Sequence, residues 1–250
     1  MSYTKKPEMI LFDVGGTLFD DGKCIPADGL AKLRLAADNP EVTDNETLAA
    51  LWDEYMNDVS GLKSKSGTYL DFLLSSPIKY VTMKTGLHYS ISMAEQEEIF
   101  DRYNSSRMVI DGVKELLETI DKLGIRTAVI SNNAMSGESL SLAIKRWIPE
   151  EKFEFFLTSA DISFSKPDKR IFETAAGYAH LETSDCWYCG DGRIPDVDGA
   201  KNSGMTPILL DVESKIPFEM RTDGGRGEYL AINSWKVLNE HLLNNLNKFS

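Results

Sequence analysis

Cysteine is scarce in this sequence and long hydrophobic runs are absent, and these two shortages exclude several classes of protein. The 250 residues include three cysteines, Cys24, Cys186 and Cys189, an odd and sparse set that does not suit the disulfide framework of a small secreted domain. No apolar run approaches the roughly 18 residues that a membrane-spanning helix needs. The run at 9–12 is too short for a secretory signal. We therefore expect a cytoplasmic protein.

Positive charge is also in short supply. Lysine and arginine number 27 against 39 aspartates and glutamates, and the formal net charge is −12. Nucleic acids and anionic membranes both require a basic surface, so we expect neither as a partner. A small phosphorylated ligand is still compatible with this charge if a local positive group holds it. Hydrophobic residues at 42% and charged residues at 26% are typical of a globular chain with a sizeable core.

The distribution of apolar residues predicts an α/β fold. A short apolar run at 9–12 indicates a buried strand that ends at Asp13 and a pair of glycines. Further strands are expected at 125–130, 153–157, 187–189, 206–210 and 229–232, and helices at 113–123, 137–147, 168–180, 195–203 and 234–246. Strands that alternate with helices form βαβ units. We expect a doubly wound, Rossmann-like parallel sheet with helices on both faces.

Residues 26–105 show mainly helical signals and no convincing strand. The four expected helices start at Pro26, after Asp44, near Tyr69 and after Ser92, where Glu95 completes a capping box. We expect Pro77 to kink or end the third helix. This block predicts a helical cap at 21–105, inserted into an α/β core that comprises residues 1–20 and 106–250.

Four polar residues follow expected strands of the sheet. Asp13, Ser131 and Asp191 come directly after strands, and Lys166 follows the aromatic strand. Each residue taken alone has an ordinary explanation as a turn residue, a helix cap or a surface charge. Ligands of parallel α/β sheets bind at the carboxyl ends of the strands, so their joint occurrence indicates a site at that edge.

Four sequence motifs surround these residues. The first motif, Phe12–Leu18, matches an Asp-x-Asp-Gly-Thr pattern except at Gly15. The other three motifs are Val129–Asn133, Ser165–Asp168 and Cys189–Ala200. With these motifs the chain resembles the haloacid dehalogenase-like hydrolases, most of which are magnesium-dependent phosphatases. The resemblance covers residues 1–20 and about 106–235, and the helical block lies where that family inserts its cap.

The resemblance implies a role for each of these residues in phosphoryl transfer. Asp13 is the implied nucleophile, which forms an aspartyl-phosphate, and Lys166 is implied to neutralise the phosphate and orient Asp13. Ser131 and the N–H of Asn132 are implied to bind phosphate oxygens. Thr17 is implied to hold the loop that carries Asp13.

The resemblance also implies a magnesium cofactor. Its implied ligands are Asp13, the backbone carbonyl of Gly15 and Asp191, and Asp196 completes the site directly or through water. Oxygen atoms of this kind are the ligands that hard divalent cations take.

One position departs from the family pattern. Phosphatases of the family usually carry a second Asp where this chain has Gly15, and that Asp protonates the leaving group and later activates water. Such a group typically contributes about 10²–10⁴-fold to the rate. The resemblance therefore implies slow hydrolysis of a small phosphorylated metabolite. Asp20, Asp21 and His88 are candidates for a replacement acid, and we expect a monomer or a homodimer.

Gly15 leaves two alternatives open. The phosphonatase branch of the family also lacks this Asp and uses a cap lysine as a Schiff base, for which Lys63 and Lys65 are available. A protein that binds metal and phosphate with little catalysis is the other alternative. The dehalogenase branch is disfavoured because it usually loses the Gly-Asp metal motif that this chain keeps at 190–191.

Overall fold

The computed structural model describes residues 3, 5–66, 73–222 and 227–244, with the side chains of 60–66 left out. The expected helix near Tyr69, the side chains of Lys63 and Lys65, and the end of the last helix at Leu246 therefore lie outside the described residues. None of the described helices combines the length and the apolar character that crossing a bilayer requires.

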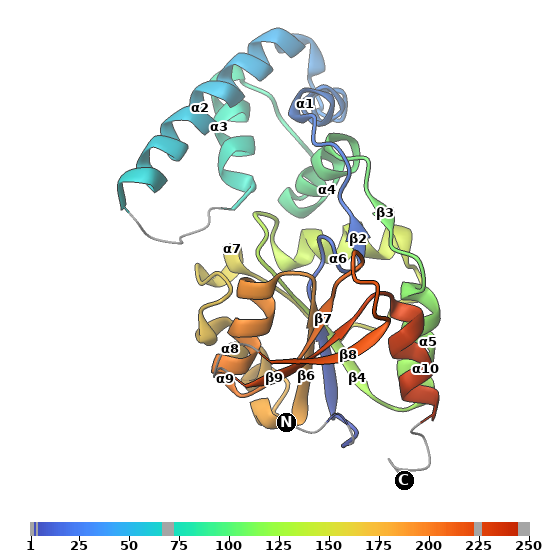
Figure 1. Cartoon of the computed structure of the whole chain (residues 1–250). Helices are drawn as coiled ribbons and strands as arrows, with labels where there is room; N and C mark the ends of the chain where they lie inside the picture. Colours follow the sequence, from blue (N-terminus) through green and yellow to red (C-terminus); the bar gives the residue numbers. More distant parts are fainter. Residues whose placement is uncertain (1–2, 4, 67–72, 223–226, 245–250) are drawn as a thin grey trace.

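A seven-stranded sheet forms the centre of the fold (Figure 1), in the order β5-β4-β1-β6-β7-β9-β8. The strands are β1 (Met9–Phe12), β4 (Arg126–Ser131), β5 (Phe156–Thr158), β6 (Cys186–Gly190), β7 (Thr206–Leu210), β8 (Phe218–Thr222) and β9 (Glu228–Ile232). In this spatial order, each strand from β5 across to β9 is parallel to the next one. The central strands β1, β6 and β7 are buried along their whole length, as their continuous apolar runs predict. The predicted α/β class with a mostly parallel sheet is confirmed.

One edge of the sheet carries an antiparallel strand in addition to the predicted parallel ones. Strand β8 pairs antiparallel with β9, with Phe218 opposite Ile232 and Thr222 opposite Glu228. Its residues alternate between exposed and partly buried, because an edge strand that returns along its neighbour keeps one face in solvent. This mixed, polar sequence lacks the apolar run that marks the central strands, so the pattern did not indicate a strand there.

Helices cover both faces of the sheet. One face carries α5 (Val113–Lys122), α6 (Gly137–Trp147) and α10 (Trp235–Asn244), and the other carries α8 (Lys169–Tyr178) and α9 (Gly199–Ser203). Short α7 (Ser159–Ile162) follows β5. Because side chains alternate along β6, Trp187 and Cys189 pack on the first face, whereas Cys186 and Tyr188 pack on the second. This alternation directs Tyr188 towards the loop before α8.

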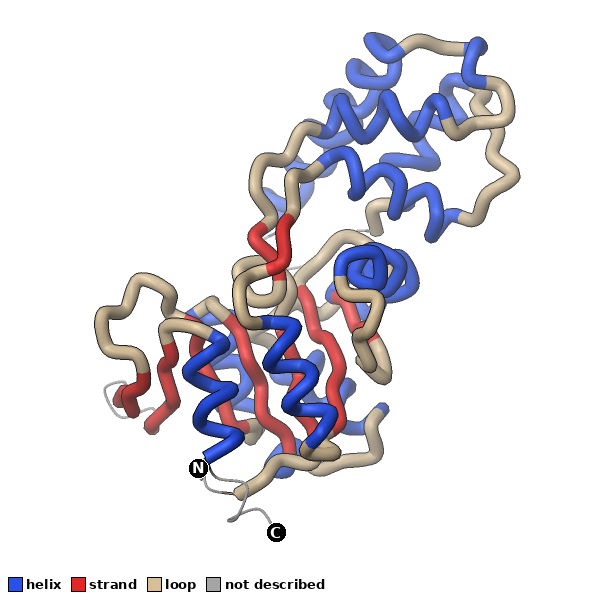
Figure 2. Tube along the Cα trace, turned by 90° about the vertical axis from the view of Figure 1, so that its right-hand side faces the viewer, coloured by secondary structure: helices blue, strands red, loops and turns tan. Residues whose placement is uncertain are grey.

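The helical block enters and leaves the core through a two-stranded ribbon, visible in red between the two parts in Figure 2. Strands β2 (Phe19–Asp20) and β3 (Met108–Val109) pair antiparallel. Between them lie α1 (Pro26–Leu35), the short turn η1 (Pro40–Val42), α2 (Asn45–Ser66), α3 (Ser75–Thr85) and α4 (Met93–Asn104). The predicted helix starts at Pro26 and after Asp44 and Ser92 are confirmed, and Ser92 forms its capping box with Glu95.

Pro77 does not end or kink a helix as expected. It lies in the first turn of α3, which begins at Ser75. The first N–H groups of a helix have no partner within it, so a proline there removes no hydrogen bond. The pattern placed this proline at the end of a helix, whereas the structure places it at a beginning.

The helical block is docked on α6 of the core. Its apolar cluster extends to Met135 and Ala143, which lie before and within α6. Glu97 of α4 is 1% exposed and accepts hydrogen bonds from the backbone N–H of Ser136 (3.1 Å) and from its hydroxyl (3.0 Å). Ser136 is the N-cap of α6. A buried carboxylate therefore faces the positive end of this helix and fixes the block to the core.

Candidate active site

The predicted site residues lie around one cavity of about 270 Å³ at the carboxyl edge of the sheet. Asp13 follows β1, Ser131 ends β4 and Asp191 follows β6. Because these three strands are neighbours in the sheet, the side chains at their ends converge. The cavity is lined by all the residues expected there, namely Asp13, Gly15, Ser131, Asn132, Lys166, Asp191 and Asp196.

Lys166 is the cation at the centre of this group. Its ammonium group is 2.7 Å from Asp13 Oδ1 and 2.6 Å from Asp196 Oδ1, and its side chain is 2% exposed. Burial alone lowers the pKa of Lys166, but the charges of the two carboxylates outweigh burial and leave this pKa above the ordinary value. Lys166 is therefore held in its charged form beside Asp13.

Two further residues position Lys166. Its ammonium group donates to the hydroxyl of Tyr188 (2.8 Å), which in turn donates to the carbonyl of Ile130 (3.1 Å). The side chain of Asn132 accepts from the N–H of Lys166 (2.7 Å) and donates to its carbonyl (2.9 Å). Sequence reasoning did not identify Tyr188, and the available signal was the alternation along β6, which places it on the face of α8.

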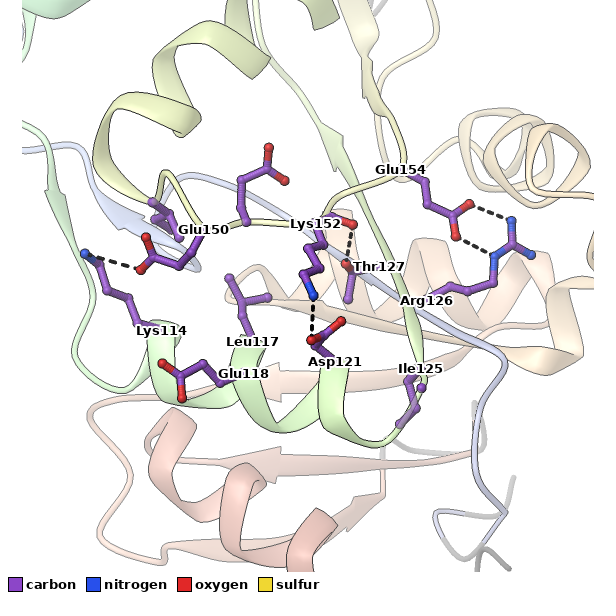
Figure 3. Close-up of a pocket in the computed structure, with 13 residues that line it drawn as sticks. Lys114, Leu117, Glu118, Asp121, Ile125, Arg126, Thr127, Glu150, Lys152 and Glu154 are labelled. Atoms are coloured by element: carbon purple, nitrogen blue, oxygen red, sulfur yellow. Dashed lines mark hydrogen bonds and ion pairs between the residues drawn. The ribbon is translucent and has the colours of Figure 1, made fainter.

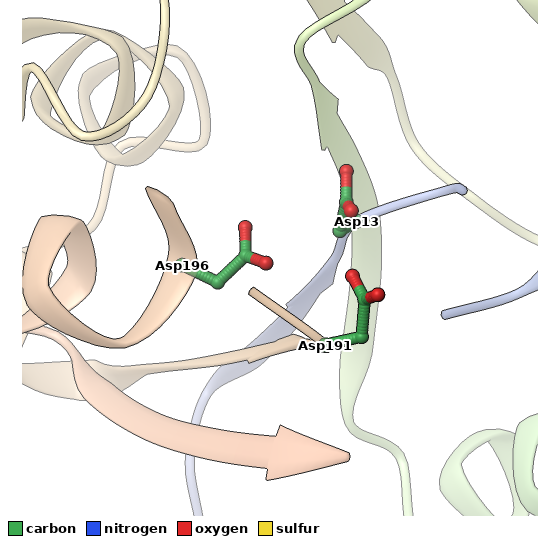
Figure 4. A group of neighbouring side chains, drawn as sticks. All are labelled: Asp13, Asp191 and Asp196. Carbon is green, nitrogen blue, oxygen red and sulfur yellow. The ribbon is translucent and has the colours of Figure 1, made fainter. Parts of the chain in front are cut away.

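Three carboxylates point towards one another in Figure 4. Oxygen atoms of Asp13, Asp191 and Asp196 lie within 4.8 Å of each other. Burial raises the pKa of Asp13 from 3.8 to about 6, with the charge of Asp196 adding to the effect and Lys166 opposing it. Burial and the charge of Asp196 also raise the pKa of Asp191. The cluster thus holds more negative charge than its surroundings compensate.

Asp196 differs from the other two carboxylates. Its Oδ1 bonds to Lys166 and lies 3.3 Å from the hydroxyl of Tyr188, and its Oδ2 accepts from the N–H of Gly192 at 2.7 Å. The residue is 2% exposed. Both of its oxygen atoms therefore already bond to protein groups, and Asp196 anchors Lys166 and the loop that carries Asp191.

The loop after Asp13 depends on a glycine with an unusual backbone. Gly16 has φ +68°, and a Cβ atom at this position would collide with the carboxylate of Asp191. Only glycine adopts this conformation without strain and leaves room for the carboxylate. The buried hydroxyl of Thr17, which was expected to hold this loop, has no hydrogen-bond partner among the described residues. The loop is instead tied through the backbone carbonyl of Thr17, which accepts from the indole of Trp235 at 2.8 Å.

The three candidates for a replacement acid lie in different places. Asp21 lines the cavity that contains Asp13. Asp20 lines an adjoining cavity of about 960 Å³. His88 lies in the helical block, where its backbone bonds to Asp38 and Asn39, and it lines neither cavity.

A separate cavity of about 490 Å³ lies at the opposite edge of the sheet, where β4 begins (Figure 3). Each lysine or arginine that lines it pairs with an acidic side chain of the same cavity. The pairs are Lys114 with Glu150 at 3.8 Å, Lys152 with Asp121 at 2.7 Å, and Arg126 with Glu154 at 2.6 Å. This cavity lies away from the strand ends that carry the predicted site, and each of its three cationic side chains is already paired with an acidic one.

Solved structures share this fold. The chain superposes on 2-haloacid dehalogenase from Pseudomonas syringae pv. Tomato DC3000 with a TM-score of 0.56 and 22% identity over 94% of this chain and 98% of that one. A HAD phosphatase from Thermococcus onnurineus gives a TM-score of 0.53 with 16% identity, over 94% and 97% of the two chains. At these identities the likeness concerns the fold alone.

Sequence comparison leads to the family. The human haloacid dehalogenase-like hydrolase domain-containing protein 3 is 35% identical over 104 residues, which make up 41% of this chain and 39% of that protein. The chain thus matches about two fifths of the length of this relative. The sequence model described as "Haloacid dehalogenase-like hydrolase" matches residues 10–210. Since this match covers most of the sheet and the whole candidate site, the chain belongs to the family of haloacid dehalogenase-like hydrolases.

Proposed function

We propose that this protein is a magnesium-dependent phosphatase that hydrolyses a small phosphate ester through an aspartyl-phosphate on Asp13. The observation that carries the proposal is the position of Asp13 in the cavity, with the buried ammonium group of Lys166 at 2.7 Å and the carboxylate of Asp191 close by. A nucleophilic carboxylate, a fixed cation and further oxygen ligands are the components that phosphoryl transfer requires.

The acidic cluster fits a divalent cation. Asp13, Asp191 and the backbone carbonyl of Gly15 offer hard oxygen atoms of the kind that Mg²⁺ prefers. Burial, with the charge of Asp196 as a smaller cause, raises the pKa values of Asp13 and Asp191, and a bound divalent cation would favour the charged forms of both carboxylates. When bound, Mg²⁺ would neutralise charge on the phosphate and the nucleophile. Asp196 would support the site through Lys166 and the loop of Asp191.

Lys166, Ser131 and Asn132 supply the other interactions with the substrate and the nucleophile. Lys166 orients Asp13 and offsets the negative charge of the phosphate group. Ser131, which is 3% exposed, and the N–H of Asn132 bind phosphate oxygens at the carboxyl end of β4. Asn132 also holds the backbone of Lys166, so one residue links the phosphate site to the cation that faces Asp13.

A phosphate ester suits this site better than a haloacid. The phosphoryl group of a monoester carries negative charge on the oxygens of the reacting phosphorus, whereas the halogenated carbon of a haloacid is uncharged. A cluster of Asp13, Asp191 and Asp196 around the reaction centre therefore favours a substrate that arrives with a cation. Lys166 alone carries one positive charge against the three carboxylates.

The test is hydrolysis of 4-nitrophenyl phosphate by the wild type and by Asp13→Asn. We expect the wild type to release phosphate with MgCl₂ and to lose this activity in EDTA. Asp13→Asn should be inactive, because an amide cannot form the covalent intermediate. Asp53→Asn, an exposed change in α2, is the matched control and should behave as the wild type.

Three results would contradict the proposal. Turnover by Asp13→Asn would remove Asp13 from the nucleophilic step. Tight magnesium-dependent binding of phosphate without turnover of any ester in a panel would indicate a binding protein. Release of halide from a 2-haloacid without activity on phosphate esters would indicate a dehalogenase.

A further inference from the structure

A carboxylate from another part of the chain lies where the side chain of residue 15 would be. A Cβ atom built on Gly15 would lie 2.5 Å from Asp21 Oδ2. Both residues line the cavity that also contains Asp13. The space that the glycine leaves empty is therefore filled by an acid six positions later in the sequence.

The fold of the nucleophile loop brings Asp21 back to this place. The N–H of Gly16 donates to the carbonyl of Phe19 at 2.7 Å, which folds the chain back on itself. Asp20 Oδ1 then accepts from the N–H of Gly22 at 3.0 Å, and this local bond closes the turn around Asp21. The side chain of Asp20 is thus used for the turn, whereas that of Asp21 is left to face the cavity.

Arg107 fixes the orientation of the Asp21 carboxylate. Its Nε lies 2.9 Å from Asp21 Oδ1, and its Nη1 lies 3.0 Å from Asp101 Oδ2. The guanidinium group also lies over the ring of Phe19, 5.8 Å from its centroid, and the side chain of Arg107 is only 9% exposed. Oδ1 of Asp21 is thereby held, and Oδ2 is the oxygen directed towards Gly15 and the cavity.

The exposure of Asp21 suits a group that exchanges protons. Its side chain is 51% exposed, in contrast to the buried Asp196, whose two oxygen atoms both bond to protein groups. A proton can therefore pass between Asp21 and solvent in each catalytic cycle. Asp20 lines only the adjoining cavity and His88 lies in the helical block, whereas Asp21 lines the cavity of Asp13, so the geometry selects Asp21.

We propose that Asp21 is the general acid and base of this enzyme, in place of the side chain missing at Gly15; the inference rests on the proposed phosphatase function. Asp13 attacks phosphorus, the bond from phosphorus to the ester oxygen breaks, and the departing oxygen takes the proton of the Asp21 carboxyl group. Asp21 then takes a proton from water as that water attacks the aspartyl-phosphate. The bond between phosphorus and Asp13 breaks, which releases phosphate and restores both residues.

This assignment replaces the expectation of slow turnover. With an acid in place, hydrolysis does not depend on a good leaving group. Arg107 is a positioning residue in this arrangement, and it connects Asp21 to Asp101 near the end of α4. The acid is thus held by a side chain that also contacts the helical block.

The test compares two esters in Asp21→Asn. Nitrophenolate leaves without a proton, so 4-nitrophenyl phosphate should still phosphorylate Asp13 rapidly in the variant. Water attack without a base is slow, so we expect a burst of one nitrophenolate per protein, followed by a steady state about 10²–10⁴-fold below the wild type. Phenyl phosphate, whose leaving group needs the proton, should show the same loss and no burst. Asp20→Asn keeps its amide oxygen for the turn and should match the wild type.

Moving the carboxylate from position 21 to position 15 distinguishes a catalytic role of Asp21 from a structural one. Gly15→Asp alone should gain nothing, because its new side chain collides with the carboxylate of Asp21. The double variant Gly15→Asp with Asp21→Ala moves the acid to position 15 and should recover at least tenfold over Asp21→Ala on phenyl phosphate. A residue that merely supports the loop would not be rescued by a carboxylate at another position.

The outcomes distinguish this inference from the proposed function. Full turnover of both esters by Asp21→Asn, with Asp13→Asn inactive, would overturn the inference and leave the phosphatase intact. An equal loss on both esters without a burst, together with failure of the relocation, would assign Asp21 to a structural or metal-binding role instead. Inactivity of the wild type on both esters would overturn both proposals.

Discussion

Replacing the nucleophile should make the metal-free protein more stable. Burial raises the pKa of Asp13 from 3.8 to about 6, although Lys166 opposes the effect. The folded state therefore holds the proton of this carboxyl group more tightly than the unfolded chain does. Ionisation of Asp13 then costs folding free energy, and Asp13→Asn, which resembles the protonated form, avoids that cost.

The pH window and the size of the effect follow from these values. Well below pH 3.8 Asp13 is protonated in both states, and the free energies of unfolding of the two proteins should converge. As the pH rises from about 4 to about 6, the unfolded chain releases its proton first, and the wild type loses stability relative to the variant. Each tenfold difference in proton affinity corresponds to about 1.4 kcal/mol, so the variant should be more stable by about 3 kcal/mol above pH 6.

Urea denaturation in EDTA between pH 4 and 8 measures this difference. Asp53→Asn provides the control for a neutralised aspartate outside the site, and its stability should follow the wild type at every pH. Addition of MgCl₂ at pH 8 should stabilise the wild type more than Asp13→Asn, because a ligand stabilises the state that binds it. Equal stabilities of Asp13→Asn and the wild type at pH 8 in EDTA would refute the reasoning.

Three further substitutions test the packing of the site. Lys166→Met should lower the free energy of unfolding by about 3–5 kcal/mol, since it leaves buried carboxylates unpaired, and a loss below about 1 kcal/mol in urea titrations at pH 8 would contradict this. Gly16→Ala should lower the free energy of unfolding by about 1 kcal/mol or more, because residue 16 has a left-handed backbone. Its methyl group should also collide with the carboxylate of Asp191 and so weaken the stabilisation by MgCl₂. An unchanged dependence of the thermal midpoint on MgCl₂ would argue against that collision. Glu97→Ala should cost about 1–3 kcal/mol by leaving the N–H of Ser136 without its acceptor, and urea titration showing no loss would remove Glu97 from the docking of the helical block.

Local patterns were sufficient to predict most of the elements. The apolar spacing from Val113 to Leu123 predicted α5, and the serine and glutamate at 92 and 95 predicted the start of α4. These signals act within a few residues, where helix periodicity and capping chemistry operate. Strand β8 lacked such a signal, because its place at the sheet edge depends on pairing with β9 rather than on its own composition.

The candidate site was likewise predicted in part from local sequence patterns. The order of strand and polar residue along the chain already placed Asp13, Ser131 and Asp191 at one edge, because parallel strands bring their carboxyl ends together. The sequence did not indicate that Tyr188 bonds to Lys166, nor that Asp21 fills the space beside Gly15. Those contacts join segments whose approach depends on the twist of the sheet and the return of the nucleophile loop. The sequence by itself determined which chemical groups reach the edge of the sheet, and only the tertiary structure decided which of them lie within reach of Asp13.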